Sequence, residues 1–89
     1  MNVIYKYPVK PDASIELPQG ARILSIHVQH SVPCLWALVN LEAPKEVRRF
    51  HTIPTGQPFD DSRLTYIGTF HGIEGWMVFH LFEETRGGA

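Results

Sequence analysis

Cysteine is nearly absent from this sequence. Cys34 is the only one among 89 residues, so no disulfide can form within the chain. Small secreted domains usually depend on several disulfides, whereas cytoplasmic proteins keep their thiols reduced. A thiol at the start of an apolar segment is typical of a small buried side chain rather than a nucleophile. The cysteine usage therefore favours a reducing, cytoplasmic environment.

An excess of positive charge is missing as well. Lysine and arginine number 8 against 9 acidic residues, and the formal net charge is −1. Proteins that hold DNA or RNA through its phosphates concentrate basic residues on one surface. We therefore expect no nucleic-acid polymer as a partner. Charged residues make up 19% of the chain, below the usual quarter or so, which leaves neutral surface for a partner or a second copy.

Long apolar runs and helical patterns are also lacking. No run approaches the ~20 residues of a membrane-spanning helix. The N-terminal sequence MNVIYKYPVK has no basic segment followed by an apolar one, so we expect no signal peptide and no membrane partner. Apolar residues nowhere recur at helical spacing across a helix-length window free of Pro and Gly.

Strand-forming segments separated by turn residues recur instead. The turn signals include Pro-Gln-Gly before Ala21 and Gly-Ile-Glu-Gly before Trp76, which predicts a hairpin. Regular short strands with this punctuation favour an all-β fold, a small antiparallel sandwich or barrel of about seven strands, forming one domain over residues 1–89. The segments cover residues 2–7, 13–17, 21–29, 34–40, 46–53, 63–71 and 76–83.

Alternation along these segments predicts their faces. In the third segment it places Leu24, Ile26 and Val28 on a buried face and leaves the other face polar. The fourth segment is apolar on both faces, which predicts a central strand with Trp36 in the core. Gly68 interrupts the sixth segment and predicts a bulge or a close approach.

The last segment, WMVFHLFE, is apolar on both faces. One face can pack into the core, and we expect an interface between identical subunits to cover the other. A chain this short buries only about 60–65% of the surface that its unfolded form exposes. Since no disulfide or metal site is expected to stabilise it, oligomerisation is the usual remedy. We therefore predict a homo-oligomer.

A Thr-Gly turn follows a basic strand in the stretch FHTIPTGQPF. Successive N–H groups in a turn can bind an anion, and arginine suits bidentate contact with phosphate. The motif is not GxxxxGK[ST] and opens no helix, so it is not a P-loop. The alternative interpretation is a structural hairpin loop with solvated arginines. The candidate anion-contacting residues are Arg48, Arg49, His51, Thr55, Gly56 and Gln57.

Five histidines are present, but their spacing does not predict a metal site. His27 and His30 lie three apart on a predicted strand and point to opposite faces, and there is no His-x-His pair. We expect no metal, no cofactor and no catalytic residue. If strand register agrees, the polar faces form one patch suited to a nucleotide, with a ring to stack on the base; the alternative is a solvated sheet face. That patch adds His27, Gln29, His71 and Trp76 to the candidate ligand-binding residues.

Four stretches carry a family resemblance: ILSIHVQHSVPCLWALVN, RRF before the Thr-Gly turn, YIGTF, and VFHLFE. Through them the chain resembles, from Ile23 to Glu83, small uncharacterised proteins of bacteriophages and prophages. That family often has Gly-Thr-Gly where this chain has Pro54-Thr55-Gly56. The difference removes one N–H donor and stiffens the loop. The resemblance implies a viral accessory protein, a class that often counters bacterial immunity and sometimes sequesters a nucleotide signal.

The expected function is therefore a phage-encoded, homo-oligomeric sponge in the cytoplasm of the infected host. Its ligand would be a nucleotide-derived immune signal, cyclic or ADP-ribose-like. One alternative is a protein–protein adaptor or inhibitor of a host protein. Another is a small phosphodiesterase-like enzyme that depends on His51 or His71. Arg48 and Arg49 in a concave pocket facing an aromatic ring would favour a ligand, whereas solvated arginines with a flat apolar patch elsewhere would favour a protein partner.

Overall fold

The computed structural model describes residues 1–72 and 76–86, which form seven strands and no helix. The all-β prediction is confirmed, and each strand overlaps its predicted segment. Nothing in the described residues is a helix able to cross a membrane. The last three residues of the predicted Gly-Ile-Glu-Gly turn, 73–75, lie outside the described residues. The strands are β1 Asn2–Pro8, β2 Asp12–Pro18, β3 Arg22–Gln29, β4 Val32–Asn40, β5 Lys45–Pro54, β6 Leu64–His71 and β7 Val78–Glu84.

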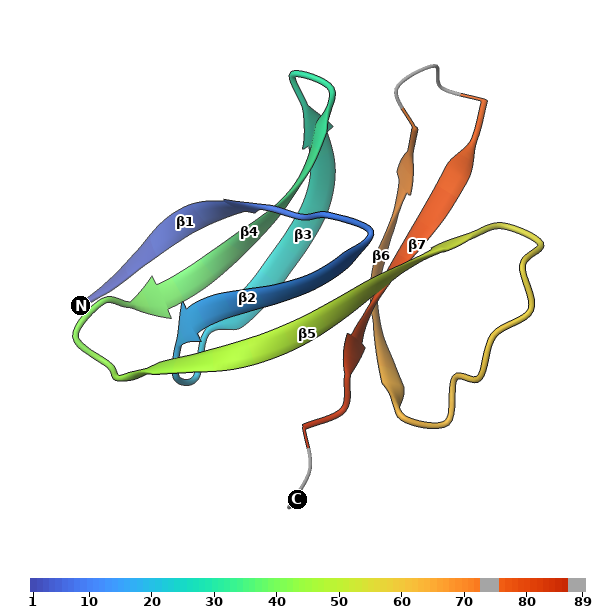
Figure 1. The fold of residues 1–89 in the computed structure, drawn as a ribbon. Coiled ribbons are helices and arrows are strands. Elements are labelled where there is room, and N and C mark those ends of the chain that lie inside the picture. The colour runs from blue at the N-terminus through green and yellow to red at the C-terminus, as the bar shows by residue number, and fades with distance from the viewer. Residues whose placement is uncertain (73–75, 87–89) are drawn as a thin grey trace.

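The strands form two sheets that pack face to face (Figure 1). One sheet has three strands in the order β1-β4-β3, and the other has four in the order β2-β5-β7-β6. Every neighbouring pair is antiparallel. The central position predicted for 34–40 is confirmed, because β4 lies between β1 and β3. β7 likewise lies inside its sheet, between β5 and β6.

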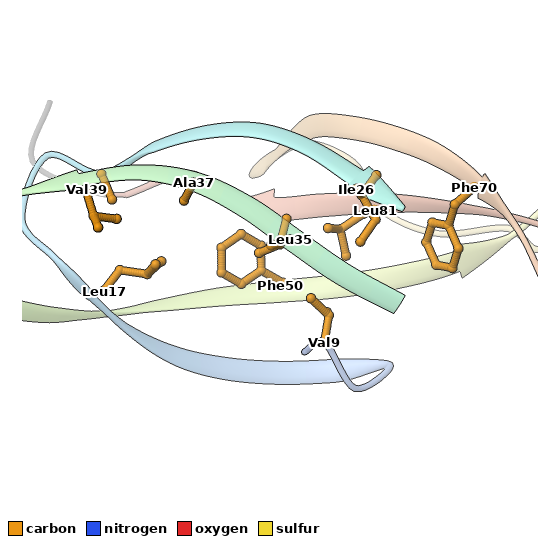
Figure 2. Packing of buried hydrophobic residues seen from close by; sticks show 10 residues of the cluster. Val9, Leu17, Ile26, Leu35, Ala37, Val39, Phe50, Phe70 and Leu81 are labelled. Atoms are coloured by element: carbon orange, nitrogen blue, oxygen red, sulfur yellow. The ribbon is translucent and has the colours of Figure 1, made fainter. Parts of the chain in front are cut away.

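The core fills the space between the sheets with alternate side chains of the facing strands (Figure 2). Leu35 from β4 and Phe50 from β5 are both fully buried, as are Leu17 and Leu81. Burying a side chain of this size contributes about 1.5–3 kcal/mol. The period of two along each strand thus decides which residues meet across the sandwich.

Two predicted core positions are wrong. The register of β3 against β4 shifts between Ile23 and Ser25, and this bulge leaves Leu24 42% exposed. The predicted alternation is regained after the bulge, where Ile26 is buried. Trp36 is only half-buried. Leu35, Ala37 and Val39 of β4 point into the core, so Trp36 between them points to the outer face of the sheet.

Gly68 combines both features predicted for it. The register of β6 against β7 shifts between Tyr66 and Gly68, which marks a bulge. A Cβ atom at Gly68 would lie 2.7 Å from Cγ2 of Ile26 on β3. The backbone of β6 therefore approaches the other sheet at a distance that only glycine allows.

The segment after β5 is a crossover and not a hairpin loop. β5 and β6 both pair antiparallel with β7, so they run parallel to one another with β7 between them. Residues 55–63 must therefore return along the length of β7, and this segment is named the crossover loop (Figure 1). It begins with a tight turn in which Gly56 has φ +89° and the N–H of Gln57 donates to Pro54 O at 3.2 Å.

The crossover loop covers part of the outer face of β7. The ring of Phe59 packs on Phe82 at 5.1 Å between centroids, and Tyr66 meets the same ring at 5.5 Å. The outward side chain of Phe82, for which a subunit interface was expected to provide cover, is thus covered within the chain. This removes one reason for predicting oligomerisation, namely the apolar second face of β7 at this point.

Candidate functional site

A cleft opens beside the crossover loop, over the ends of β2, β5 and β7. Its volume is about 750 Å³, within the range of roughly 300–1,000 Å³ typical of small-molecule sites. The loop supplies one wall and the strand ends supply the other. We call it the crossover cleft; it is lined by Asp12, His51, Thr52, Ile53, Pro54, Gln57, Phe59, Asp60, Ser62, Arg63, Leu64, Glu84 and Thr85.

His51 is held between two carboxylates in this cleft. Its Nδ1 lies 3.0 Å from Oδ1 of Asp12 on β2, and its Nε2 lies 2.7 Å from Oε2 of Glu84 on β7. The hydrogen bonds to Asp12 and then to Glu84 raise the pKa of His51, and desolvation opposes them. Both ring nitrogens donate when the imidazole is charged. His51 thus links three neighbouring strands and has no ring nitrogen left for a substrate.

The cleft carries more negative than positive charge. Asp12, Asp60 and Glu84 supply three carboxylates against the single guanidinium of Arg63. The backbone N–H of Ser62 donates to Oδ1 of Asp60 at 2.9 Å and lowers the pKa of that carboxyl. Such a site accepts hydrogen bonds from hydroxyl, amino or cationic groups more readily than it binds a polyanion.

The charge on His51 predicts a pH effect on stability. Because the pKa of His51 is raised in the folded protein, its contribution is fully present below the unfolded value of about 6.5 and is lost as pH rises through the folded value. Wild-type protein should therefore lose up to about 1 kcal/mol relative to His51→Gln between pH 6 and 8, a small effect because the two ion pairs are partly exposed. Urea unfolding at several pH values measures this difference.

A matched variant tests the cause of the pH effect. Asp12→Asn with Glu84→Gln keeps both side-chain shapes while removing the charges beside His51. In that background the pH-dependent stability difference that His51→Gln produces should disappear, and its persistence would assign the effect to another histidine.

Arg48 does not reach the cleft. Alternation placed Arg48 and Arg49 on opposite faces, and the face of Arg48 is the core side. Its Nε and Nη2 donate to Glu83 at 2.5 and 2.8 Å, and Nη1 donates to the Ala21 carbonyl at 2.6 Å. The Arg48 side chain is 5% exposed. Its guanidinium is used within the fold and cannot contact a ligand in the cleft.

The Thr-Gly turn has few donors left for an anion. The N–H of Thr55 donates to Val78 O at 3.0 Å, and that of Gln57 is used inside the turn. The Thr55 hydroxyl also donates to Val78 O, and it lies 2.7 Å from Nε2 of His80. Nδ1 of His80 is 2.9 Å from the hydroxyl of Thr69 on β6. The turn is thus anchored to the sheet, and Gly56 holds the one turn N–H that these bonds leave.

The remaining candidate residues do not gather at one place. Because β3 and β5 belong to different sheets, the outward-facing His27 and Gln29 lie across the sandwich from His51. His71 shares the outer face of the four-stranded sheet with His51 but pairs with Val78. His51 pairs with Phe82, four residues away along β7, which is roughly 13 Å.

Trp76 and Arg49 also lie outside the crossover cleft. Trp76 lines a second, apolar groove of about 310 Å³ between the ends of the sheets. Arg49 faces outward on β5 and lines a small polar depression with Glu46 and Arg86. Of the ten candidates, two line the crossover cleft, His51 and Gln57.

Sequence reasoning missed the carboxylates that surround His51. Asp12 directly precedes the predicted second strand, and Glu84 directly follows the predicted last one. Both strands extend one residue further than expected, and those end residues line the cleft. The sequence signal that could have identified these two residues was an acidic residue at the end of each strand. Phe59 and Arg63 were missed because the crossover loop was expected to join adjacent strands.

Comparison with known proteins identifies a family without an assigned activity. No curated protein and no solved structure matches the chain. Residues 1–89 match the family described as Domain of unknown function (DUF7352). Since the match covers the whole chain, this protein belongs to the DUF7352 family.

Proposed function

We propose that this protein is a phage-encoded binding protein that sequesters a nucleotide-derived immune signal in the crossover cleft. The observation that carries the proposal is a ligand-sized cleft in which hydrogen-bond acceptors stand beside an exposed aromatic ring. The phage origin rests on the sequence resemblance, and an anti-defence role in the host cytoplasm follows from that origin by analogy.

The cleft offers a partner for each part of a nucleoside. Carboxylates such as Asp12 and Glu84 accept hydrogen bonds from ribose hydroxyls, as acidic residues do in dinucleotide sites. Phe59 is 41% exposed, so its ring has surface on which a base can stack. The guanidinium of Arg63 pairs with no carboxylate in the described part of the chain and suits one phosphate.

The charge of the cleft narrows the ligand class. Arg63 is the one guanidinium that lines the cleft, whereas two arginines and the Thr-Gly turn were expected to hold phosphates. A ligand anchored by its ribose and base fits this site better than one anchored by several phosphates, because each further phosphate meets a carboxylate. This argument disfavours polyphosphates and fits an ADP-ribose-like molecule, one of the two expected ligand classes beside cyclic nucleotides.

The hydrogen bonds of His51 and His80 favour ligand binding over catalysis. A general base needs a ring nitrogen directed at the substrate, whereas both nitrogens of His51 contact carboxylates. Both nitrogens of His80 contact threonine hydroxyls. The phosphodiesterase-like alternative therefore has no histidine in the cleft with a free nitrogen.

Calorimetric titration tests the proposal with ADP-ribose, adenosine and ATP as probes. ADP-ribose should bind, and ATP should bind at least about tenfold more weakly, a difference of about 1.4 kcal/mol. Phe59→Ala should weaken ADP-ribose about 5- to 150-fold, the effect of losing about 1–3 kcal/mol of stacking. Tyr66→Ala is the matched control, because Tyr66 also packs on Phe82 but does not line the cleft.

The outcomes separate the functions. Absence of heat with all three probes would count against the proposed function. ADP-ribose recovered intact after denaturation supports sequestration, whereas cleaved ligand would make the protein an enzyme. Equal affinity for ATP and ADP-ribose would contradict the inference from charge.

The adaptor function remains the second candidate because of the apolar groove. Trp76 is 71% and Met77 41% exposed beside it. Exposed apolar surface of this kind is typical of protein-binding sites. A host protein that binds the wild type directly and no longer binds Met77→Glu, in a protein of unchanged stability, would favour this candidate.

A further inference from the structure

The edge of the three-stranded sheet is open along β1. β1 pairs with β4 on one side, and no strand of the described chain pairs with its other side. The pairing with β4 runs without a register shift from Asn2 to Pro8. The only proline is the last residue of the strand. β1 therefore presents a regular row of backbone N–H and C=O groups to a further strand.

The other sheet edges carry features that discourage pairing. β3, the other edge of the three-stranded sheet, has a bulge between Ile23 and Ser25, and β6 has one before Gly68, where its backbone turns toward β3. β2 carries exposed Asp12 and Glu16 along its edge. Bulges and charged residues are the usual means by which proteins protect an edge. β1 has no bulge, and its protection is weaker than that of these three strands.

Both faces of β1 expose apolar side chains. Val3 and Tyr5 share the inward-facing side of Val39 and Ala37, their partners on β4, yet they are 38% and 46% exposed. Ile4 points to the outer side and is 60% exposed. An additional strand beside β1 would remove part of this apolar surface from water.

The single charge of β1 is directed away from the edge. The amino group of Lys6 donates to Oε1 of Gln29 on β3 at 2.5 Å and lies 5.9 Å from the centre of the Trp36 ring. Lysine on an edge strand normally repels a second strand of like charge. Because this lysine reaches back across its own sheet, its charge lies away from the open edge of β1.

We propose that β1 pairs with β1 of a second copy of this chain, antiparallel about a twofold axis. The two three-stranded sheets would then form one continuous sheet through both copies. A second copy fits because the pairing is self-complementary: each strand offers the same donors and acceptors, and apolar residues meet apolar residues without like charges opposite. A short chain also has most to gain from burying further apolar surface.

Native mass spectrometry and light scattering test the proposal. Wild-type protein should be dimeric at micromolar concentration, and Ile4→Lys should shift the dissociation constant upward at least about tenfold, because two lysines then face one another across the edge. Val47→Lys is the matched control, since Val47 is 54% exposed on β5 of the other sheet. Thermal unfolding checks that both variants remain folded.

Cross-linking locates the interface independently of that variant. Cys34 is the only cysteine and is buried, so Cys34→Ser gives a background in which single cysteines can be placed. Ile4→Cys, Tyr5→Cys and Lys6→Cys in turn should include one that forms an interchain disulfide on mild oxidation, whereas Val47→Cys should not. A monomer at all concentrations, or a dimer that Ile4→Lys leaves unchanged, would overturn the proposal, and neither result bears on ligand binding in the cleft.

Discussion

Replacing Arg48 with methionine should lower the free energy of unfolding by about 3–5 kcal/mol, the cost of breaking a buried ion pair by removing one partner. The carboxylate of Glu83 would stay in the core, since its side chain is 9% exposed. Arg86 compensates only in part, because its Nη1 pairs with Glu46 at 2.7 Å and its Nε lies 4.0 Å from Oε2 of Glu83. An 89-residue domain has a total stability of only about 5–15 kcal/mol. Urea unfolding by circular dichroism measures the loss.

The double variant Arg48→Met with Glu83→Leu is the control for that prediction. Replacing both charges with apolar groups of similar volume is often close to neutral. Here the Ala21 carbonyl also loses its donor from Arg48, so we expect a residual cost of about 1–3 kcal/mol. A double variant as unstable as Arg48→Met alone would show that the loss comes from packing rather than from the unpaired carboxylate.

Gly68→Ala should cost about 1–3 kcal/mol although it adds one methyl group. The new Cβ would lie 2.7 Å from Cγ2 of Ile26. Ile26 is buried at the base of the β3–β6 contact and, being branched at Cβ, has restricted χ1 freedom with which to move away. Thermal or urea unfolding of the variant measures the cost.

The partner residue supplies the control for the glycine variant. Ile26→Leu removes the branch that carries Cγ2 while conserving volume, a change that usually costs less than about 1.5 kcal/mol. In that background Gly68→Ala should cost clearly less than in the wild type, giving a favourable coupling in the double-mutant cycle. Additive costs would place the strain elsewhere in the bulge.

The strands were predictable because their signals are local. Alternation of apolar and polar residues, ended by Pro and Gly, depends only on neighbouring positions, and a period of two gives Arg48 and Phe50 the same face of β5. Alternation did not indicate which face of β5 is buried, because each face carries an arginine. Glu83, which makes a buried Arg48 tolerable, lies 35 residues away in the sequence.

Bulges and strand order limited the rest of the prediction. A bulge adds one residue to a strand and has no characteristic amino-acid composition. Alternation therefore put Leu24 on the wrong side of its strand. Strand order depends on packing between distant segments, and nothing near FHTIPTGQPF indicates that β7 inserts between β5 and β6. The residues of the crossover cleft are brought together by that insertion, which is why His51 was predicted and its two carboxylates were not.

The interior position of the last strand has a consequence for biosynthesis. A ribosome releases the chain from its N-terminus, so the three-stranded sheet has all its residues once Asn40 has emerged. In the four-stranded sheet β7 lies between β5 and β6 and pairs with both. The hydrogen bonds that join β5 and β6 through β7 cannot form until β7 is made. Until then Phe50 lacks Leu81, a buried neighbour on the adjacent strand. The nascent chain thus carries a half-built hydrophobic layer until β7 has emerged, and the four-stranded sheet can be completed only after that point.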